Sequence, residues 1–269
     1  MKRSFLSISF LFLGAFLSAR ALPQDELRDQ YFDSDGITIR YVESGDGVPV
    51  VLHHGYTGSL EAFLRTGVFQ ALANDYRVIA FDARGHGKSG KPYEAAAYGE
   101  EMSNDVIRLL DHLDISRAHV VGYSMGVRVL SKTVTSHEDR FLTFVLGGFA
   151  PARNWSSVDD ENMKSRSEDF LINPPQSVIE RDLDIEALAT LVLGFSELAV
   201  TNEELIDLKL PMLSVIGSED LNFEGVMELK ALIPRLELVV IDGATHTAAP
   251  SYTEFLESIQ TFLADNTNQ

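Results

Sequence analysis

Short apolar runs alternate along this chain with longer segments of helical periodicity. The runs are bounded by turn residues and predict buried strands at 48–52, 77–81, 120–121, 141–146, 212–216 and 238–241. The intervening segments place apolar residues three and four positions apart, as amphipathic helices do, at 103–114, 127–134 and 226–233. Strands that alternate with helices predict a mostly parallel sheet covered by helices on both faces, an α/β fold.

Two further patterns frame this alternation. Residues 31–42 alternate apolar and polar side chains around Asp35-Gly36, which predicts a β-hairpin. Near the other end, Ser251-x-x-Glu254 matches a capping box and predicts the start of a helix with one apolar face.

Residues 151–208 interrupt the rhythm. They contain the only tryptophan, Trp155, the pair Pro174-Pro175 and helical patches such as 185–195, but no buried strand. We interpret the segment as a helical cap inserted over the sheet. Because caps of this kind supply substrate walls and exclude water, Trp155 is a candidate substrate-binding residue.

The first residues have the pattern of a secretory signal peptide. Lys2 and Arg3 precede an apolar run at 5–17, and Ala19-Arg20-Ala21 matches the cleavage pattern. The run is shorter than the roughly 20 residues of a typical membrane span. We therefore expect residues 1–21 to be removed from a periplasmic or secreted protein whose single domain is 22–269; an uncleaved N-terminal anchor is the alternative.

Composition narrows the possible functions. The 269 residues are 45% apolar, which suits one globular domain with a substantial core. Without cysteine the chain has no disulfides and no thiolate metal site. A formal charge of −18 argues against nucleic acid and anionic membrane surfaces as partners. The expected partner is a small-molecule substrate, and the oligomeric state stays open.

The strongest chemical motif is Gly122-Tyr123-Ser124-Met125-Gly126, which fits G-x-S-x-G between a predicted strand and a predicted helix. In this context the serine is a candidate nucleophile that needs a neighbouring base. The N–H of Met125, at a helix N-terminus, is a candidate oxyanion donor. The second candidate is the N–H of Tyr56, in the glycine-rich loop that follows an earlier strand. For His53 and His54 in that loop we expect a packing role.

Two further candidates follow later strands. Asp220 lies just after the strand at 212–216, and His246 lies after the strand at 238–241. The carboxyl ends of parallel strands share one edge of a sheet, so Ser124, Asp220 and His246 are expected to meet there. His246 would take the proton of Ser124, and Asp220 would orient His246. Glu219 and Asp242 compete with Asp220 for that role.

Together these motifs resemble the α/β-hydrolase superfamily over residues 31–265. The resemblance rests on His54-Gly55-Tyr56, 82–89, the Ser124 motif, Gly217-Ser218-Glu219-Asp220 and His246. It implies an eight-stranded, mostly parallel sheet, a cap after the sixth strand and no cofactor or metal. Superfamily dehalogenases and many epoxide hydrolases place Asp at the nucleophile position, so Ser124 argues against both.

The predicted function is a serine hydrolase that cleaves a small carboxylic ester through an acyl-enzyme. Two alternatives stay open. One is a perhydrolase or carbon–carbon-bond hydrolase with the same triad, and the other is a small-molecule sensor that uses the fold for binding alone.

Overall fold

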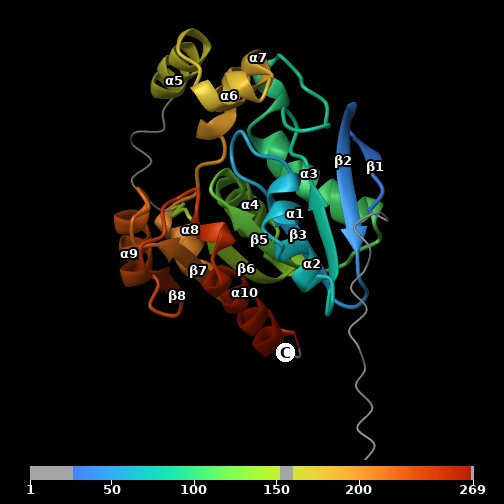
Figure 1. The fold of residues 1–269 in the computed structure, drawn as a ribbon, viewed down its shortest axis with the longest axis vertical. Helices are drawn as coiled ribbons and strands as arrows, with labels where there is room; N and C mark the ends of the chain where they lie inside the picture. The colour runs from blue at the N-terminus through green and yellow to red at the C-terminus, as the bar shows by residue number, and fades with distance from the viewer. Residues whose placement is uncertain (1–26, 152–159, 268–269) are drawn as a thin grey trace, which may run out of the picture.

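The computed structural model describes residues 27–151 and 160–267, which form an α/β fold around one sheet (Figure 1). The eight strands have the order β1-β2-β4-β3-β5-β6-β7-β8. Only β2 runs antiparallel to its neighbours; all other neighbouring strands pair in parallel, which confirms the predicted fold class. The strands are β1 (Gln30–Ser34), β2 (Ile37–Ser44), β3 (Pro49–His53), β4 (Arg77–Phe81), β5 (Ala118–Tyr123), β6 (Phe141–Gly147), β7 (Met212–Gly217) and β8 (Glu237–Ile241).

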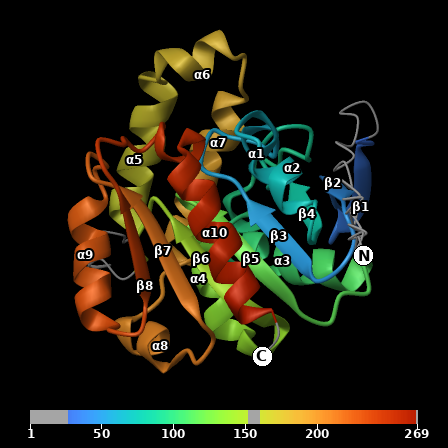
Figure 2. The ribbon, with the colours of Figure 1, turned by 60° about the horizontal axis from the view of Figure 1, so that its bottom comes forward.

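Helices bury apolar side chains against both faces of this sheet. One face is covered by α1 (Glu61–Arg65), α2 (Val68–Leu72) and α10 (Thr253–Asn266). The opposite face is covered by α3 (Glu100–His112), α4 (Met125–Ser136) and α9 (Phe223–Leu232). Figure 2 shows α10 lying across the strands on its face. Because helices cover both faces, the central strands are buried throughout, which explains their uninterrupted apolar runs.

The predicted hairpin is present as β1 and β2. Asp35 and Gly36 form its turn with φ angles of 55° and 83°, and both are positive, as a tight hairpin turn requires. After the turn, residues 39–42 of β2 are buried. Arg40 has only 4% of its surface exposed, because the carboxylates of Asp29, Glu61 and Asp82 surround its guanidinium.

The segment between β6 and β7 forms four helices within its described part, residues 160–207. They are α5 (Asp160–Ile172), α6 (Gln176–Glu180), α7 (Ile185–Leu193) and α8 (Asn202–Asp207). In Figure 1, α5, α6 and α7 lie together beyond one end of the sheet, and α5 packs against α7. The helix α8 instead returns to the body and contacts α4. The signal-peptide segment 1–21 and Trp155 lie outside the described residues.

The predicted capping box at Ser251 is wrong, although the helix predicted to follow it is present. Ser251 closes a short 3₁₀ turn that begins at Ala249, and α10 starts only at Thr253 with Tyr252 as its N-cap. No side chain caps that end of α10. A true capping box opens α8, where Thr201 accepts from the N–H of Glu204 and Glu204 accepts from the N–H of Thr201.

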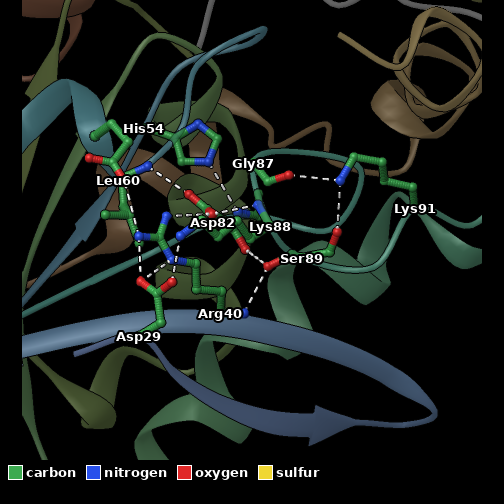
Figure 3. Close-up of polar contacts among 11 residues, drawn as sticks. Asp29, Arg40, His54, Leu60, Asp82, Gly87, Lys88, Ser89 and Lys91 are labelled. Atoms are coloured by element: carbon green, nitrogen blue, oxygen red, sulfur yellow. Dashed lines mark hydrogen bonds and ion pairs between the residues drawn. The ribbon is translucent and has the colours of Figure 1, made fainter. Parts of the chain in front are cut away.

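A buried aspartate fixes the loop that follows β3 (Figure 3). Asp82, directly after β4, is fully buried and accepts from the N–H of Leu60 at 2.8 Å and from the N–H of Lys88 at 2.8 Å. The Arg40 guanidinium lies 3.2 Å from the same carboxylate. The ring of His54 accepts from the N–H of Ala83 at 3.1 Å. These bonds hold residues 54–60 in place beside the carboxyl ends of the strands.

Within the described ranges, no helix is both long and apolar enough to span a membrane. The same residues contain no cluster of His, Asp and Glu side chains suited to hold a metal ion.

Candidate active site

A sharp turn between β5 and α4 presents Ser124. The backbone of this serine has φ 53° and ψ −111°, a strained conformation for a residue with a side chain. The turn is possible only because its neighbours are glycines. A Cβ on Gly126 would lie 2.1 Å from the carbonyl oxygen of His53, and one on Gly122 would lie 2.7 Å from the backbone of Gly126. The turn therefore lifts the serine hydroxyl clear of the backbone.

Three side chains from separate loops meet at this turn. The Nε2 of His246, after β8, lies 3.0 Å from the Oγ of Ser124. The Nδ1 of the same ring lies 2.7 Å from the Oδ2 of Asp220, after β7. The structure thus brings together the three residues that the sequence selected. The competitors Glu219 and Asp242 are exposed, and the hydrogen bond of His246 Nδ1 is to Asp220.

The surroundings of His246 determine which of its nitrogens carries the proton. Asp220 is a fully buried carboxylate, and its other oxygen accepts from the N–H of Asn222 at 2.9 Å. A carboxylate at 2.7 Å from Nδ1 accepts a hydrogen bond, so Nδ1 carries the proton. The lone pair of Nε2 then points at Ser124 and can accept its proton. The hydroxyl of Tyr123 donates to the backbone carbonyl of His246 and holds that loop.

The two proposed oxyanion donors flank Ser124. Met125 is the first residue of α4, and Tyr56 lies in the loop after β3. Both residues line the same cavity as Ser124. Among the described residues, neither N–H donates to a protein acceptor. A Cβ on Gly55 would lie 3.3 Å from that of Ser124, so the loop passes close to the nucleophile. Both N–H groups are therefore available to a ligand.

Histidines pack behind that loop as buried, neutral rings. Burial, together with the neighbouring His54, lowers the pKa of His53 to about 3. Burial also lowers the pKa of His54 and that of His86. His86 packs edge-on against the rings of His54 and Tyr56, with centroids 5.0 and 6.0 Å apart. These rings lie beneath the loop and have the packing role expected for them.

A cavity of about 350 Å³ opens in front of Ser124. Its walls come from the body and from the cap helices α5 and α7, and its apolar part includes Phe149, Phe170, Val192 and Phe195. Trp155, the residue predicted to bind substrate, lies outside the described residues. Arg128 and Arg166, which the sequence patterns did not single out, also line the cavity. A signal existed for Arg128, since it is a charge among apolar residues one helical turn after Ser124.

Comparison with known proteins agrees with this geometry. Residues 48–170 match the α/β-hydrolase-fold family. In solved structures, the chain is similar to a carboxylesterase from the thaumarchaeon Nitrososphaera gargenis. That likeness has a TM-score of 0.76 at 20% identity and covers 89% of this chain and 99% of the other. The chain belongs to the α/β-hydrolase superfamily. The structural likeness, at this low identity, speaks for the fold alone.

Curated relatives match shorter segments. The acetyltransferase component of the acetoin cleaving system of Cupriavidus necator is 38% identical over 129 residues, 46% of this chain and 34% of that protein. A non-heme chloroperoxidase of Streptomyces lividans is 38% identical over 110 residues, 39% of this chain and 38% of that protein. The chain thus matches little more than a third of the length of either relative. Their activities differ, so they leave the substrate of this hydrolase-fold protein open.

Proposed function

We propose that this α/β-hydrolase-fold protein is a serine hydrolase that cleaves a small carboxylic ester through an acyl-enzyme. The observation that carries the proposal is the continuous hydrogen-bond chain from Asp220 through His246 to Ser124. This series of hydrogen bonds ends at Ser124, in the wall of a cavity that has room for a small substrate.

The reaction follows from the proton positions in that chain. Ser124 Oγ attacks the ester carbonyl carbon while its proton passes to His246 Nε2. The bond from carbon to the alcohol oxygen breaks, and the proton moves from His246 to the departing alcohol. A water molecule, deprotonated by His246, then attacks the acyl carbon. The bond to Oγ breaks, the carboxylic acid leaves, and Ser124 regains its proton.

The strained turn and the helix end supply the electrostatic part of the proposal. The negative charge that develops on the carbonyl oxygen would be held by the N–H groups of Tyr56 and Met125. One such donor contributes about 3 to 4 kcal/mol to lowering the barrier in enzymes of this kind. Asp220 has a separate task, since it keeps His246 in the tautomer that accepts from Ser124 and stabilises the imidazolium.

A second candidate is a perhydrolase, favoured by the similarity to a non-heme chloroperoxidase. If hydrogen peroxide replaces water in the second step, the same acyl-enzyme yields a peracid and free Ser124. Hydrolysis and perhydrolysis therefore share the first half-reaction and differ in the acceptor of the acyl group. Measuring peracid formation from acetic acid and hydrogen peroxide separates the two.

The test is Ser124→Ala with p-nitrophenyl acetate and p-nitrophenyl butyrate as substrates. Loss of the nucleophile is expected to lower kcat by a factor on the order of 10⁶. The matched control is Ser136→Ala, an exposed serine at the other end of the same helix, which should keep wild-type kcat. Full esterase activity in Ser124→Ala would refute the proposal. So would an inactive wild-type protein on a broad ester panel.

A further inference from the structure

Two arginines face the cavity in front of the nucleophile. Arg128 comes from α4, one helical turn after Ser124, and Arg166 comes from the cap helix α5. Residues four apart on a helix share one face, with Cβ atoms about 5 to 6 Å apart, so Arg128 reaches the space directly beside Ser124. Two positive groups in one small cavity are unusual in a chain with a formal charge of −18.

The guanidinium of Arg128 is held between two aromatic rings. It lies 5.0 Å from the ring centroid of Phe149 and 4.9 Å from that of Phe195. Both rings also line the cavity. Such stacking fixes the plane of the guanidinium, the group whose N–H donors match a planar anion. Arg128 is therefore a positioned cation rather than a freely moving surface charge.

Arg166 faces no counterion among the described residues. In 27–151 and 160–267 it makes neither an ion pair nor a hydrogen bond. By contrast, Arg40, Arg84 and Arg108 each face at least one carboxylate. Burial, and then the positive charge of Arg166, lower the pKa of Arg128 to about 10. The two cations thus repel each other across the cavity.

Of the described residues, one acidic side chain also lines this cavity. Asp169 lies one turn after Arg166 on α5, and its carboxylate accepts from the side-chain amide of Asn173 at 2.9 Å. Among the described residues, two arginines and one aspartate give the cavity lining one net positive charge. A ligand with a single negative charge would balance it.

We infer that the substrate carries a carboxylate, which Arg128 and Arg166 bind while Ser124 attacks the ester carbonyl. This inference rests on the proposed hydrolase function and adds the substrate class: esters that also carry a free carboxylate a few bonds from the scissile ester, on either the acyl or the alcohol side. The carboxylate is planar and takes two parallel N–H donors from a guanidinium, a geometry that neutral groups of similar size cannot match.

The experiment compares substrates of the same shape with and without charge. Monomethyl glutarate and methyl glutaramate differ only in a carboxylate against a carboxamide. The acetate ester of 4-hydroxybutyrate and that of 4-hydroxybutyramide place the same difference on the alcohol side. In the wild type, kcat/KM for the charged member of at least one pair should exceed that of its neutral partner by roughly ten- to hundredfold, the size expected of hydrogen bonds to a charged group.

Variants then test whether the two arginines cause the preference for the charged substrate. Arg166→Gln should reduce the charged-to-neutral ratio about tenfold, and Asp169→Asn should raise it, because the two changes alter the cavity charge in opposite directions. The matched control is Lys164→Gln, which removes one positive charge from an exposed position of the same helix without touching the cavity. It should leave the ratio as in the wild type. Arg128→Lys keeps the charge but loses the planar fork, and should lower the ratio as well.

Failure of this inference and failure of the proposed function give different results. If the wild type hydrolyses both neutral esters as fast as the charged ones, the carboxylate inference is wrong while the hydrolase proposal stands. The carboxylate inference is equally wrong if Lys164→Gln lowers the ratio as much as Arg166→Gln. If no ester is hydrolysed, the proposed function fails. In that case calorimetry with glutarate and glutaramide still tests the site, because equal or absent binding of the two overturns it.

Discussion

Two buried aspartates follow strands of the same sheet and have opposite surroundings. Asp82, after β4, receives donors from Leu60, Lys88 and Arg40, all of them fixed parts of the protein. Asp220, after β7, receives the N–H of Asn222 and the ring of His246. His246 is about a third exposed and continues the chain to Ser124 at the cavity. All the donors to Asp82 are thus inside the protein, whereas the hydrogen bonds that start at Asp220 continue through His246 to Ser124 at the cavity.

The comparison shows how the same residue type serves structure or chemistry. A buried carboxylate is stable only when its oxygens are hydrogen-bonded, and both aspartates meet that condition. The difference lies in the partner. The Asp82 donors are backbone amides and a permanently charged guanidinium, which have no second protonation state to use near neutral pH. The Asp220 donor is an imidazole, whose other nitrogen can gain and lose a proton.

Replacing Asp220 should have the largest effect, and on activity alone. In Asp220→Asn the side-chain amide would favour the tautomer of His246 with the proton on Nε2, so Ser124 loses its base. We expect kcat to fall by about 10⁴-fold. The free energy of unfolding should change by no more than about 1 kcal/mol, because the amide still forms a hydrogen bond with His246. Steady-state kinetics and urea denaturation measure both. A variant with near-wild-type kcat would show that Asp220 does not orient His246.

Replacing Asp82 should have the reverse outcome. Asp82→Asn removes one of the carboxylates that face Arg40 and replaces one acceptor oxygen with an NH2 donor, which would face N–H donors in a buried site. The free energy of unfolding should fall by about 3 kcal/mol. For molecules that remain folded, kcat should fall far less than in Asp220→Asn. If Asp82→Asn were as stable as the wild type, the structural role assigned to this network would be wrong.

Acid should destabilise the fold through the buried ring of His53 at the end of β3. The pKa of His53 is lowered to about 3 by burial, and in the unfolded chain it returns to about 6.5. Between these values the unfolded chain binds more protons, so the free energy of unfolding rises with pH from about 3 to 6.5. Urea denaturation at several pH values measures the slope. His53→Asn removes this proton and should give a shallower slope; an unchanged slope contradicts the assignment.

The smallest predicted effect concerns two identical cap patterns. Thr201-x-x-Glu204 forms a capping box at α8, whereas Ser251-x-x-Glu254 does not cap α10. Thr201→Ala should cost about 1 kcal/mol of stability, and Ser251→Ala should be nearly neutral. Both residues are exposed, so packing changes little in either variant. Equal losses in the two variants would mean that the hydroxyl of Thr201 does not cap α8.

The local sequence pattern was sufficient to predict the sheet and to predict that Ser124, Asp220 and His246 meet, for a physical reason. Ser124, Asp220 and His246 each follow a parallel strand, and parallel strands bring those positions to one edge whatever path the loops take. The strand before His246, β8, was expected to be buried but is an edge strand with only Ile241 fully buried. The capping box predicted at Ser251 does not form because Ser251 is part of a 3₁₀ turn that precedes α10. The position of Arg166 at the cavity could not be predicted from the sequence. Its helix, α5, belongs to the cap, and the spacing of apolar residues in α5 does not indicate which face of the helix meets the cavity. The burial of Arg40 likewise depends on a partner, Asp82, that lies far along the chain.

The central claim is that Ser124 is an activated nucleophile, and labelling with a fluorophosphonate tests it most directly. The wild-type protein should take up one phosphonyl group per chain, and peptide mass spectrometry should locate it on Ser124. Labelling should be absent in Ser124→Ala and strongly slowed in His246→Ala, since the probe reacts only with a hydroxyl whose proton has a nearby acceptor. A wild-type protein that hydrolyses esters but carries the label on another residue, or takes up none, would contradict the account.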